Sequence, residues 1–151
     1  MKKNIFYVTV CFTAVLFLLT SCEKEKDNAP PAKTKTELLI SSPWKFQSAS
    51  AAGVGDISGV PQLACFVDNT LTFTSPTAGN INEGSVVCSP STAGAFTWNF
   101  TTSETVLVLS GPLIPGGTGT FNIVSLNETN LVVSQSVNFP PPTVITITFK
   151  H

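Results

Sequence analysis

Few residues of this chain could carry out nucleophilic or acid–base chemistry. The 151 residues include one histidine, His151, and no arginine. A nucleophilic serine needs a neighbouring base, so an imidazole at the end of the chain argues against Ser-His-Asp hydrolysis. The segment Ser42-Pro43-Trp44-Lys45 has Ser-x-x-Lys spacing. Its proline, however, prevents the helical turn that would bring the lysine onto the serine.

Two carboxylates are the remaining catalytic candidates. Asp68 and Glu83 both lie between Cys65 and Cys88, and a pair of carboxylic acids can hydrolyse glycosides. The simpler interpretation is that Asp68 caps a turn or strand start and that Glu83 lies on a solvated face, because nothing nearby except burial would raise a pKa. We therefore predict a protein that is not an enzyme, with no cofactor and no metal site.

The charge of the chain excludes one class of partner. From Thr36 onward there are two lysines, Lys45 and Lys150, against six acidic residues, which is a formal charge of −4. Nucleic-acid binding requires a basic face that replaces counterions on the phosphates. We therefore expect no nucleic-acid partner.

The N-terminus has the pattern of a secretory signal. A basic start, Met1-Lys2-Lys3-Asn4, precedes a largely apolar run from Ile5 to Leu19, followed by small residues. The run is shorter than the roughly 20 residues that span a bilayer. The quartet Leu19-Thr20-Ser21-Cys22 resembles the lipobox of bacterial lipoproteins, although a membrane span or ordinary secretion would be alternatives. The resemblance implies that residues 1–21 are a signal peptide and that Cys22 carries acyl chains such as palmitate.

The segment after Cys22 is predicted to be a tether. Residues 22–35 are charged and then proline-rich, which disfavours a packed structure. The charged stretch resembles the export tag of surface lipoproteins in Bacteroidota-type bacteria, but it could equally be a plain spacer. We expect a lipid-anchored protein of the cell outer membrane, on either its periplasmic or its outer side.

The cysteines support an oxidising compartment. With Cys11 in the signal and Cys22 lipidated, Cys65 and Cys88 remain as an even pair, for which a disulfide is the default outside the cytoplasm. The alternative is a metal pair, but it lacks further ligands, since no CxxC spacing exists and the sole histidine is terminal.

Hydrophobic patterning predicts an all-β domain after a short helix. Thr34 and Glu37 have capping-box spacing, and Pro43 must end the helix that they begin. Period-two alternation then predicts eight strands, with a turn at Gly79-Asn80. In the first strand, Trp44, Phe46 and Ser48 should share one face. The predicted strands cover residues 44–48, 70–74, 81–88, 96–101, 106–109, 121–126, 131–136 and 145–150. Such strands either close into an up-and-down barrel or stack as a sandwich.

Aromatic residues recur along the inward faces of these strands. They are the normal content of a core, but an eight-stranded barrel is also just wide enough to hold one small ligand. If it does, the open end should lie at the loops 53–60 and 111–119. The candidate ligand-lining residues are Phe73, Phe96, Trp98, Phe100 and Phe121.

The order of these segments resembles the lipocalin-like domain lipoproteins of Bacteroidota. The likeness covers roughly residues 36–151 and rests on Trp44-Lys45, Cys65-Phe66-Val67-Asp68-Asn69, Phe96-Thr97-Trp98-Asn99-Phe100 and Ile145-Thr146-Ile147-Thr148-Phe149. It implies an eight-stranded antiparallel lipocalin-like barrel, with Trp44 packed at a closed end behind the N-terminal helix. The family has no common assigned function.

Two functions follow as expectations. The first is a lipoprotein whose barrel binds a small apolar ligand. The second is a filled-core interaction module, an envelope adaptor or hydrolase inhibitor, with exposed contacts at residues 111–115 and 139–142. The interior of the barrel should distinguish them, because ligand pockets have volumes above about 300 Å³.

Overall fold

The structure is a computed structural model, which describes residues 30–114, 116–138 and 142–151. Residues Lys33–His151 form one compact unit, which begins slightly before the domain start predicted at residue 36. This unit contains all the described helices and strands and the core. It therefore has the contacts of an independently folding domain.

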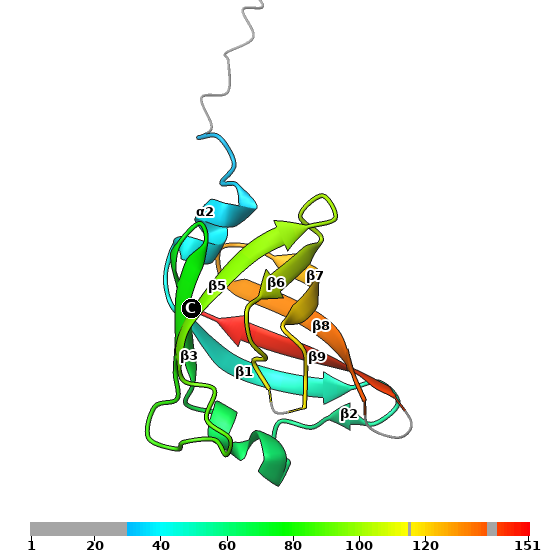
Figure 1. Cartoon of the computed structure of the whole chain (residues 1–151). Coiled ribbons are helices and arrows are strands. Elements are labelled where there is room, and N and C mark those ends of the chain that lie inside the picture. The colour runs from blue at the N-terminus through cyan, green and yellow to red at the C-terminus, as the bar shows by residue number, and fades with distance from the viewer. Residues whose placement is uncertain (1–29, 115, 139–141) are drawn as a thin grey trace, which may run out of the picture. The chain divides into compact units, whose positions relative to one another are not determined.

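The unit is almost entirely β-structure (Figure 1). It has one short α-helix and one 3₁₀ helix. The helices are α2 (Lys35–Ile40) and η1 (Pro61–Phe66), and the strands are β1 (Trp44–Ala51), β2 (Gly55–Asp56), β3 (Thr70–Ser75), β4 (Ala78–Asn82), β5 (Gly94–Thr101), β6 (Val106–Leu109), β7 (Thr120–Leu126), β8 (Asn130–Val137) and β9 (Thr143–Lys150).

The eight longer strands form a closed antiparallel barrel. From β3 to β9 each strand pairs with the next along the chain, and β1 pairs with both β3 and β9. The two-residue strand β2 is an addition to the end of β1. The prediction of an all-β, eight-stranded up-and-down barrel with a short N-terminal helix is confirmed.

Helix α2 covers one end of the barrel (Figure 1). The predicted capping box is present: Thr34 N donates to Glu37 Oε2 at 2.7 Å, and Glu37 N donates to Thr34 Oγ1 at 3.2 Å. Trp44 is fully buried, and its Nε1 donates to the carbonyl of Leu39 at 2.9 Å. The helix and the first strand are thus joined at this end.

A β-bulge changes which residues of β1 point into the barrel. Phe46 pairs with Phe149 and Ser48 with Thr148, so Gln47 is an extra residue on β1. After the bulge Ala49 is the buried residue, and Ser48 is only half-buried. The predicted inward position of Ser48 is therefore wrong, because one inserted residue reverses the alternation.

Strand β4 lies earlier in the chain than the strand predicted over residues 81–88. Gly79-Asn80 was expected to form a turn before a strand over residues 81–88, but both residues lie within β4. The glycine is needed for packing, not for a turn: a Cβ on Gly79 would lie 2.1 Å from Cζ of Phe96. The segment from Glu83 to Ala93 is a loop held by side-chain hydrogen bonds.

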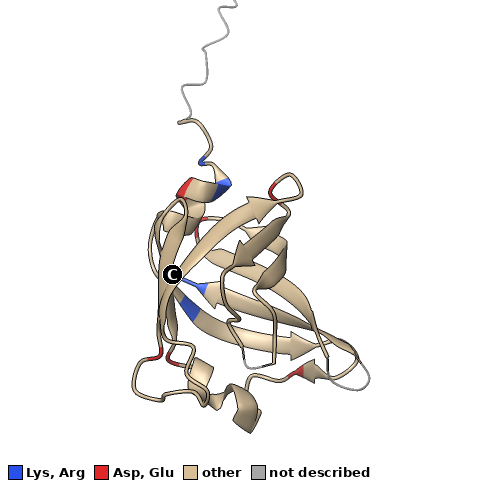
Figure 2. Ribbon diagram, in the orientation of Figure 1, with Lys and Arg blue, Asp and Glu red and all other residues tan. Residues whose placement is uncertain are grey.

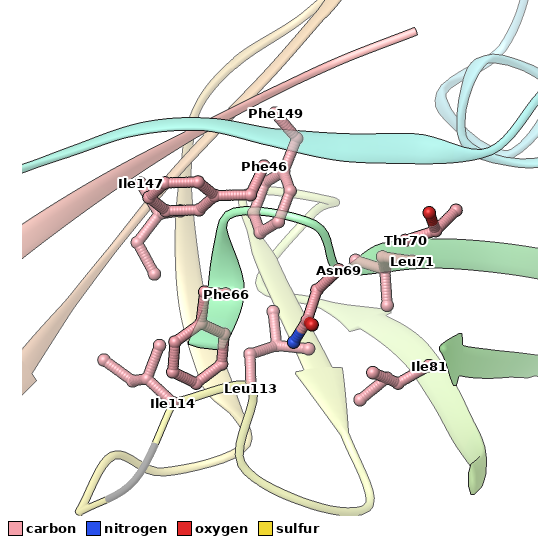
Figure 3. Close-up of a pocket in the computed structure, with 10 residues that line it drawn as sticks. All are labelled: Phe46, Phe66, Asn69, Thr70, Leu71, Ile81, Leu113, Ile114, Ile147 and Phe149. Atoms are coloured by element: carbon pink, nitrogen blue, oxygen red, sulfur yellow. The ribbon is translucent and has the colours of Figure 1, made fainter. Parts of the chain in front are cut away.

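The barrel interior is filled with side chains. Phe73 makes edge-to-face contacts with Phe96 and Trp98, with centroids 5.5 and 5.1 Å apart. At the end opposite α2, which we call the loop end, Leu113 and Ile114 turn inward and are only 7% and 4% exposed (Figures 1 and 3). The cavity beside them has a volume of about 20 Å³, enough for about one water.

This packing corrects one expectation about the loop after β6. Leu113 and Ile114 were predicted to be exposed contacts for a partner, but they are buried. The physical reason is that the free energy of the folded protein falls when apolar residues cover a barrel mouth that is lined by apolar side chains. The other predicted contact, residues 139–142, lies outside the described residues except for Pro142, which is exposed.

Candidate functional site: an apolar groove at the loop end

The aromatic residues predicted to line a ligand cavity lie mainly in the core. Phe73, Phe96, Trp98 and Phe121 are between 0% and 6% exposed, and Phe100 is half-buried. The rings of Phe73, Phe96, Trp98 and Phe100 pack edge-to-face on one another. This is the packing expected of a core, the first of the two interpretations that the sequence allowed.

An apolar groove lies at the loop end of the barrel. Its volume is about 520 Å³, within the range of roughly 300 to 1,000 Å³ that is typical of small-molecule sites. Five of its lining residues carry branched aliphatic side chains. The groove is lined by Ile57, Val60, Gln62, Leu63, Ile114, Gly116 and Ile145.

One wall of the groove is the segment that leads from β2 into η1. Ile57 N donates to the carbonyl of Ala49 at 2.9 Å, which attaches this segment to β1. Val60 N donates to Ile57 O at 3.1 Å, and Leu63 N donates to Val60 O at 2.9 Å. These backbone bonds hold three of the apolar lining residues at fixed positions along one short stretch.

Asp56 stabilises the same wall. Its Oδ1 accepts hydrogen bonds from Ser58 N at 2.9 Å and from Ser58 Oγ at 2.6 Å. These two bonds lower the pKa of the Asp56 carboxyl group. Asp56 is therefore an anion at neutral pH, next in sequence to the lining residue Ile57.

The other wall comes from the loop after β6 and from β9. Ile145 pairs in register with Gln135 on β8. Gln135 is 2% exposed, and its Oε1 accepts from Thr118 N at 2.9 Å. Among the described residues nothing pairs with Gln135 Nε2.

The sequence reasoning did not identify Gln135 as a functional candidate. The signal was nevertheless present, because Gln135 is the one polar residue in the inward row Leu131, Val133, Gln135 and Val137. A buried amide in such a row destabilises the folded state unless its polar atoms are hydrogen-bonded.

A second cleft lies where β5 and β6 separate. Its volume is about 300 Å³, and its lining includes Ala95, Phe96 and Pro112. Ser110 N donates to Thr97 O, so continued pairing would place Pro112 opposite Ala95. Proline has no N–H to donate, which explains why the ladder stops and the chain turns into the barrel mouth.

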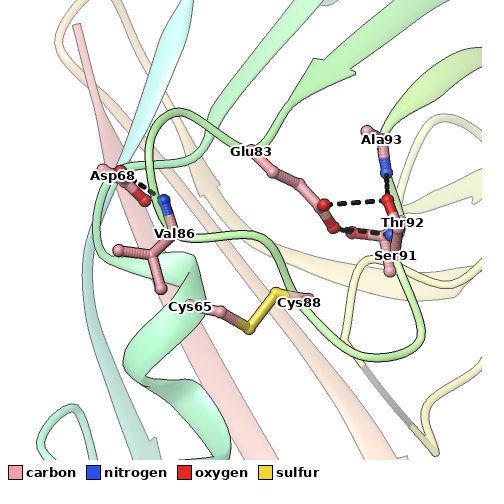
Figure 4. Close-up of a disulfide and its surroundings, with 8 residues drawn as sticks. All are labelled: Cys65, Asp68, Glu83, Val86, Cys88, Ser91, Thr92 and Ala93. Atoms are coloured by element: carbon pink, nitrogen blue, oxygen red, sulfur yellow. Dashed lines mark hydrogen bonds between the residues drawn. A yellow bond between two sulfur atoms is a disulfide. The ribbon is translucent and has the colours of Figure 1, made fainter.

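The predicted disulfide is present. Cys65 and Cys88 are bonded, with Cα atoms 5.1 Å apart (Figure 4). The bond joins the end of η1 to the loop after β4. It therefore closes the segment that carries both candidate catalytic carboxylates.

The two carboxylates hold this loop in place (Figure 4). Asp68 accepts from Val86 N at 3.2 Å and from Ser85 N at 2.7 Å. Glu83 is 3% exposed, which corrects the solvated position predicted for it. It accepts from Ser91 Oγ at 2.8 Å and from Thr92 N at 2.6 Å.

The electrostatics of Glu83 disfavour general-acid catalysis. The hydrogen bond from the Thr92 backbone N–H is the main cause of a lowered Glu83 pKa. A general acid at neutral pH needs a raised pKa. The geometry therefore supports a structural role for this carboxylate.

His151 is held in place by the residues around it. Its ring stacks on Trp44 with centroids 3.7 Å apart, and its Nδ1 lies 2.6 Å from Ser42 Oγ. Its Nε2 lies 3.3 Å from Ser41 Oγ. In the described part of the chain no carboxylate contacts this imidazole, so the orienting acid of a triad is not among its neighbours.

A scan against protein-family models and a search of the curated proteins both find no match for this chain. Across the described ranges, no three His, Cys, Asp or Glu side chains gather as a metal site would require. In the same ranges, no helix is long and apolar enough to cross a bilayer. The predicted signal and Cys22 lie outside the described residues.

Proposed function

We propose that this protein is a lipid-anchored, non-enzymatic protein of the cell envelope that binds a small apolar ligand in the groove at the loop end. The observation that carries the proposal is the contrast between two spaces. The barrel interior has a cavity of about 20 Å³, whereas the groove has about 520 Å³ and five branched aliphatic residues.

The barrel then acts as a rigid scaffold, not as a container. The closed sheet and the packed aromatic core fix β1 and β9, which position Ile57 and Ile145. A groove held in this way loses little conformational entropy when a ligand binds, because its walls are already ordered. The resemblance to lipocalin-like domain lipoproteins supports the choice of an apolar ligand.

The test of ligand binding uses a hydrophobic fluorescent probe, N-phenyl-naphthylamine, with the Lys33–His151 unit. Val60→Asp places a charge in the groove, and Val124→Asp places the same charge on the outer face of β7, where Val124 is 60% exposed. We expect Val60→Asp to abolish the fluorescence gain and Val124→Asp to leave it unchanged. Equal binding by both variants would refute this site.

The lipid anchor is proposed on the lipobox-like quartet ending at Cys22. In cells fed a palmitate analogue, the wild-type chain should take up label and Cys22→Ala should not. Unchanged labelling of the variant would refute the anchor while leaving the groove proposal intact.

A second candidate function is a protein-interaction module, which the filled interior favours. Val67, Val86 and Val87 are 60%, 51% and 66% exposed near the disulfide. Apolar side chains gathered on a surface are typical of partner contacts. Loss of cross-linked envelope partners on replacing all three valines with serine, with probe binding retained, would favour this function over ligand binding.

A further inference from the structure

One buried polar group in the described chain has an unused hydrogen-bonding capacity. Gln135 is 2% exposed, and its Nε2 has no partner among the described residues. Buried amide donors are nearly always paired, since an unpaired one loses its bonds to water and gains nothing in return. The unpaired donor therefore requires an explanation.

The orientation of this amide is set by its neighbour. Thr118 N donates to Gln135 Oε1 at 2.9 Å, and Thr118 Oγ1 lies 3.3 Å from the same oxygen. A backbone N–H can only donate, so the amide oxygen must face Thr118. Exchanging the oxygen and nitrogen would place two donors against each other, and Nε2 consequently points away from Thr118.

The amide has two neighbours that line the groove. Gln135 pairs across the sheet with Ile145, which lines the groove. A Cβ on Gly117 would lie 2.8 Å from Gln135 Nε2 and 2.9 Å from Cγ1 of Ile114, another lining residue. The free N–H thus shares its immediate surroundings with the side chain of Ile114.

We propose that Gln135 determines specificity in the groove: its Nε2 donates a hydrogen bond to an uncharged acceptor oxygen, such as an ester or ketone carbonyl, of an otherwise aliphatic ligand. This inference rests on the proposed function. Because Nε2 is buried, this bond requires a neighbouring side chain of the wall, such as Ile114, to change rotamer. Sites of this kind combine apolar walls with a few placed polar groups that orient the ligand.

The charges on the barrel favour a neutral ligand over a carboxylate. Figure 2 shows basic residues beside α2 and partway along the barrel, and none on the described segments at the loop end. Lys45 and Lys150 pair in register. Ile145 is five residues from Lys150 along β9, a separation of about 16 Å in a strand. The charged group nearest to the groove in sequence is the anion Asp56. A free fatty acid would therefore gain no ion pair in the groove.

The experiment compares three probes of ten or eleven carbon atoms on the Lys33–His151 unit: methyl decanoate, undecane and decanoate. The binding of each probe is measured by its displacement of N-phenyl-naphthylamine. The ester gives up hydrogen bonds to water when it binds, so the quantity compared is the ratio of ester affinity to undecane affinity. We expect this ratio to be about tenfold higher in the wild type than in Gln135→Leu, because the variant leaves the buried ester carbonyl without a donor. Decanoate should bind more weakly than the ester. The control Gln47→Leu, at the exposed bulge residue of β1, which does not line the groove, should keep the wild-type ratio.

A measurement on the wild type covers the case in which Gln135→Leu does not fold. The side-chain amide protons of Gln135 should shift in NMR spectra on adding methyl decanoate and not on adding undecane. A ratio of ester to undecane affinity that is the same in the wild type and in Gln135→Leu overturns the inference. Failure of every probe to bind would overturn the groove function as well, whereas binding of the probes with an unchanged ratio would overturn the role of Gln135 alone.

Discussion

Gly79 lies beneath the aromatic ring of Phe96, so close that a Cβ on Gly79 would lie 2.1 Å from Cζ and 2.5 Å from Cε2 of that ring. The two residues pair across β4 and β5. The ring of Phe96 in turn packs edge-to-face on Phe73. Replacing one Cα hydrogen of Gly79 with a methyl group would therefore displace the Phe96 ring and disturb the centre of the core.

Gly79→Ala should destabilise the protein by about 2 kcal/mol or more, because overpacked cores force side chains off their preferred rotamers. Thermal unfolding followed by circular dichroism is the measurement. Gly59→Ala is the control, since a Cβ there meets no described atom within 4 Å. Equal melting temperatures for the two variants would contradict the assigned packing.

Loss of the disulfide should lower stability without changing the fold. Cys65 and Cys88 are 23 residues apart, and closing a loop of that size contributes about 3 kcal/mol in the chain-entropy model. The double variant Cys65→Ser/Cys88→Ser should show a urea midpoint shifted down by the corresponding amount. Reductant should shift the wild type in the same direction and leave the double variant unaffected; a shift in both would point to another cause.

Glu83 should make stability depend on pH. Its pKa is lowered in the folded state, so its contribution is fully present above the unfolded pKa of about 4.3 and is lost as the pH falls through the lower folded value. Glu83→Gln should thus be less stable than the wild type at neutral pH, and the difference should shrink below about pH 4. Urea unfolding at several pH values measures this. A difference in stability that stays constant with pH for Glu83→Gln would count against the assigned bonds.

Leu113→Ala should open the barrel interior. Leu113 is 7% exposed and lines the cavity of about 20 Å³. Truncation of a buried leucine costs about 2 to 5 kcal/mol and leaves a larger void. We expect a lower melting temperature and a gain of xenon binding, visible as chemical-shift changes around Phe66 and Leu71. The exposed Val86→Ala should change neither quantity.

Strands with strict alternation could be predicted from the sequence. In β5, Phe96 and Trp98 face inward as expected, and in β9 Ile145, Ile147 and Phe149 do the same. Each of these segments carries its own period-two pattern, and one face is buried wherever such a strand closes a core. The helix cap at Thr34 and Glu37 is equally local, and it too was predicted.

The errors occurred where the deciding contact is distant in sequence. From the sequence, Gly79 is typical of a turn. Only the close approach of the Phe96 ring, 17 residues away in the chain, explains why a glycine lies within β4. Residue 48 loses its inward position because the pairing with β9 absorbs one extra residue. Leu113 and Ile114 are apolar residues of a loop, and only the open mouth of a closed barrel gives them a place to be buried.

By itself, the sequence determined the all-β class, the strand alternation, the helix cap and the two cysteines available for a disulfide, because these follow from local pattern and composition. Only the tertiary structure decided that the barrel is filled, that a groove of about 520 Å³ lies at the loop end, and that the described residues leave a donor of Gln135 unpaired. Packing decides such features, since side chains from distant strands must occupy one volume before the remaining space can be located.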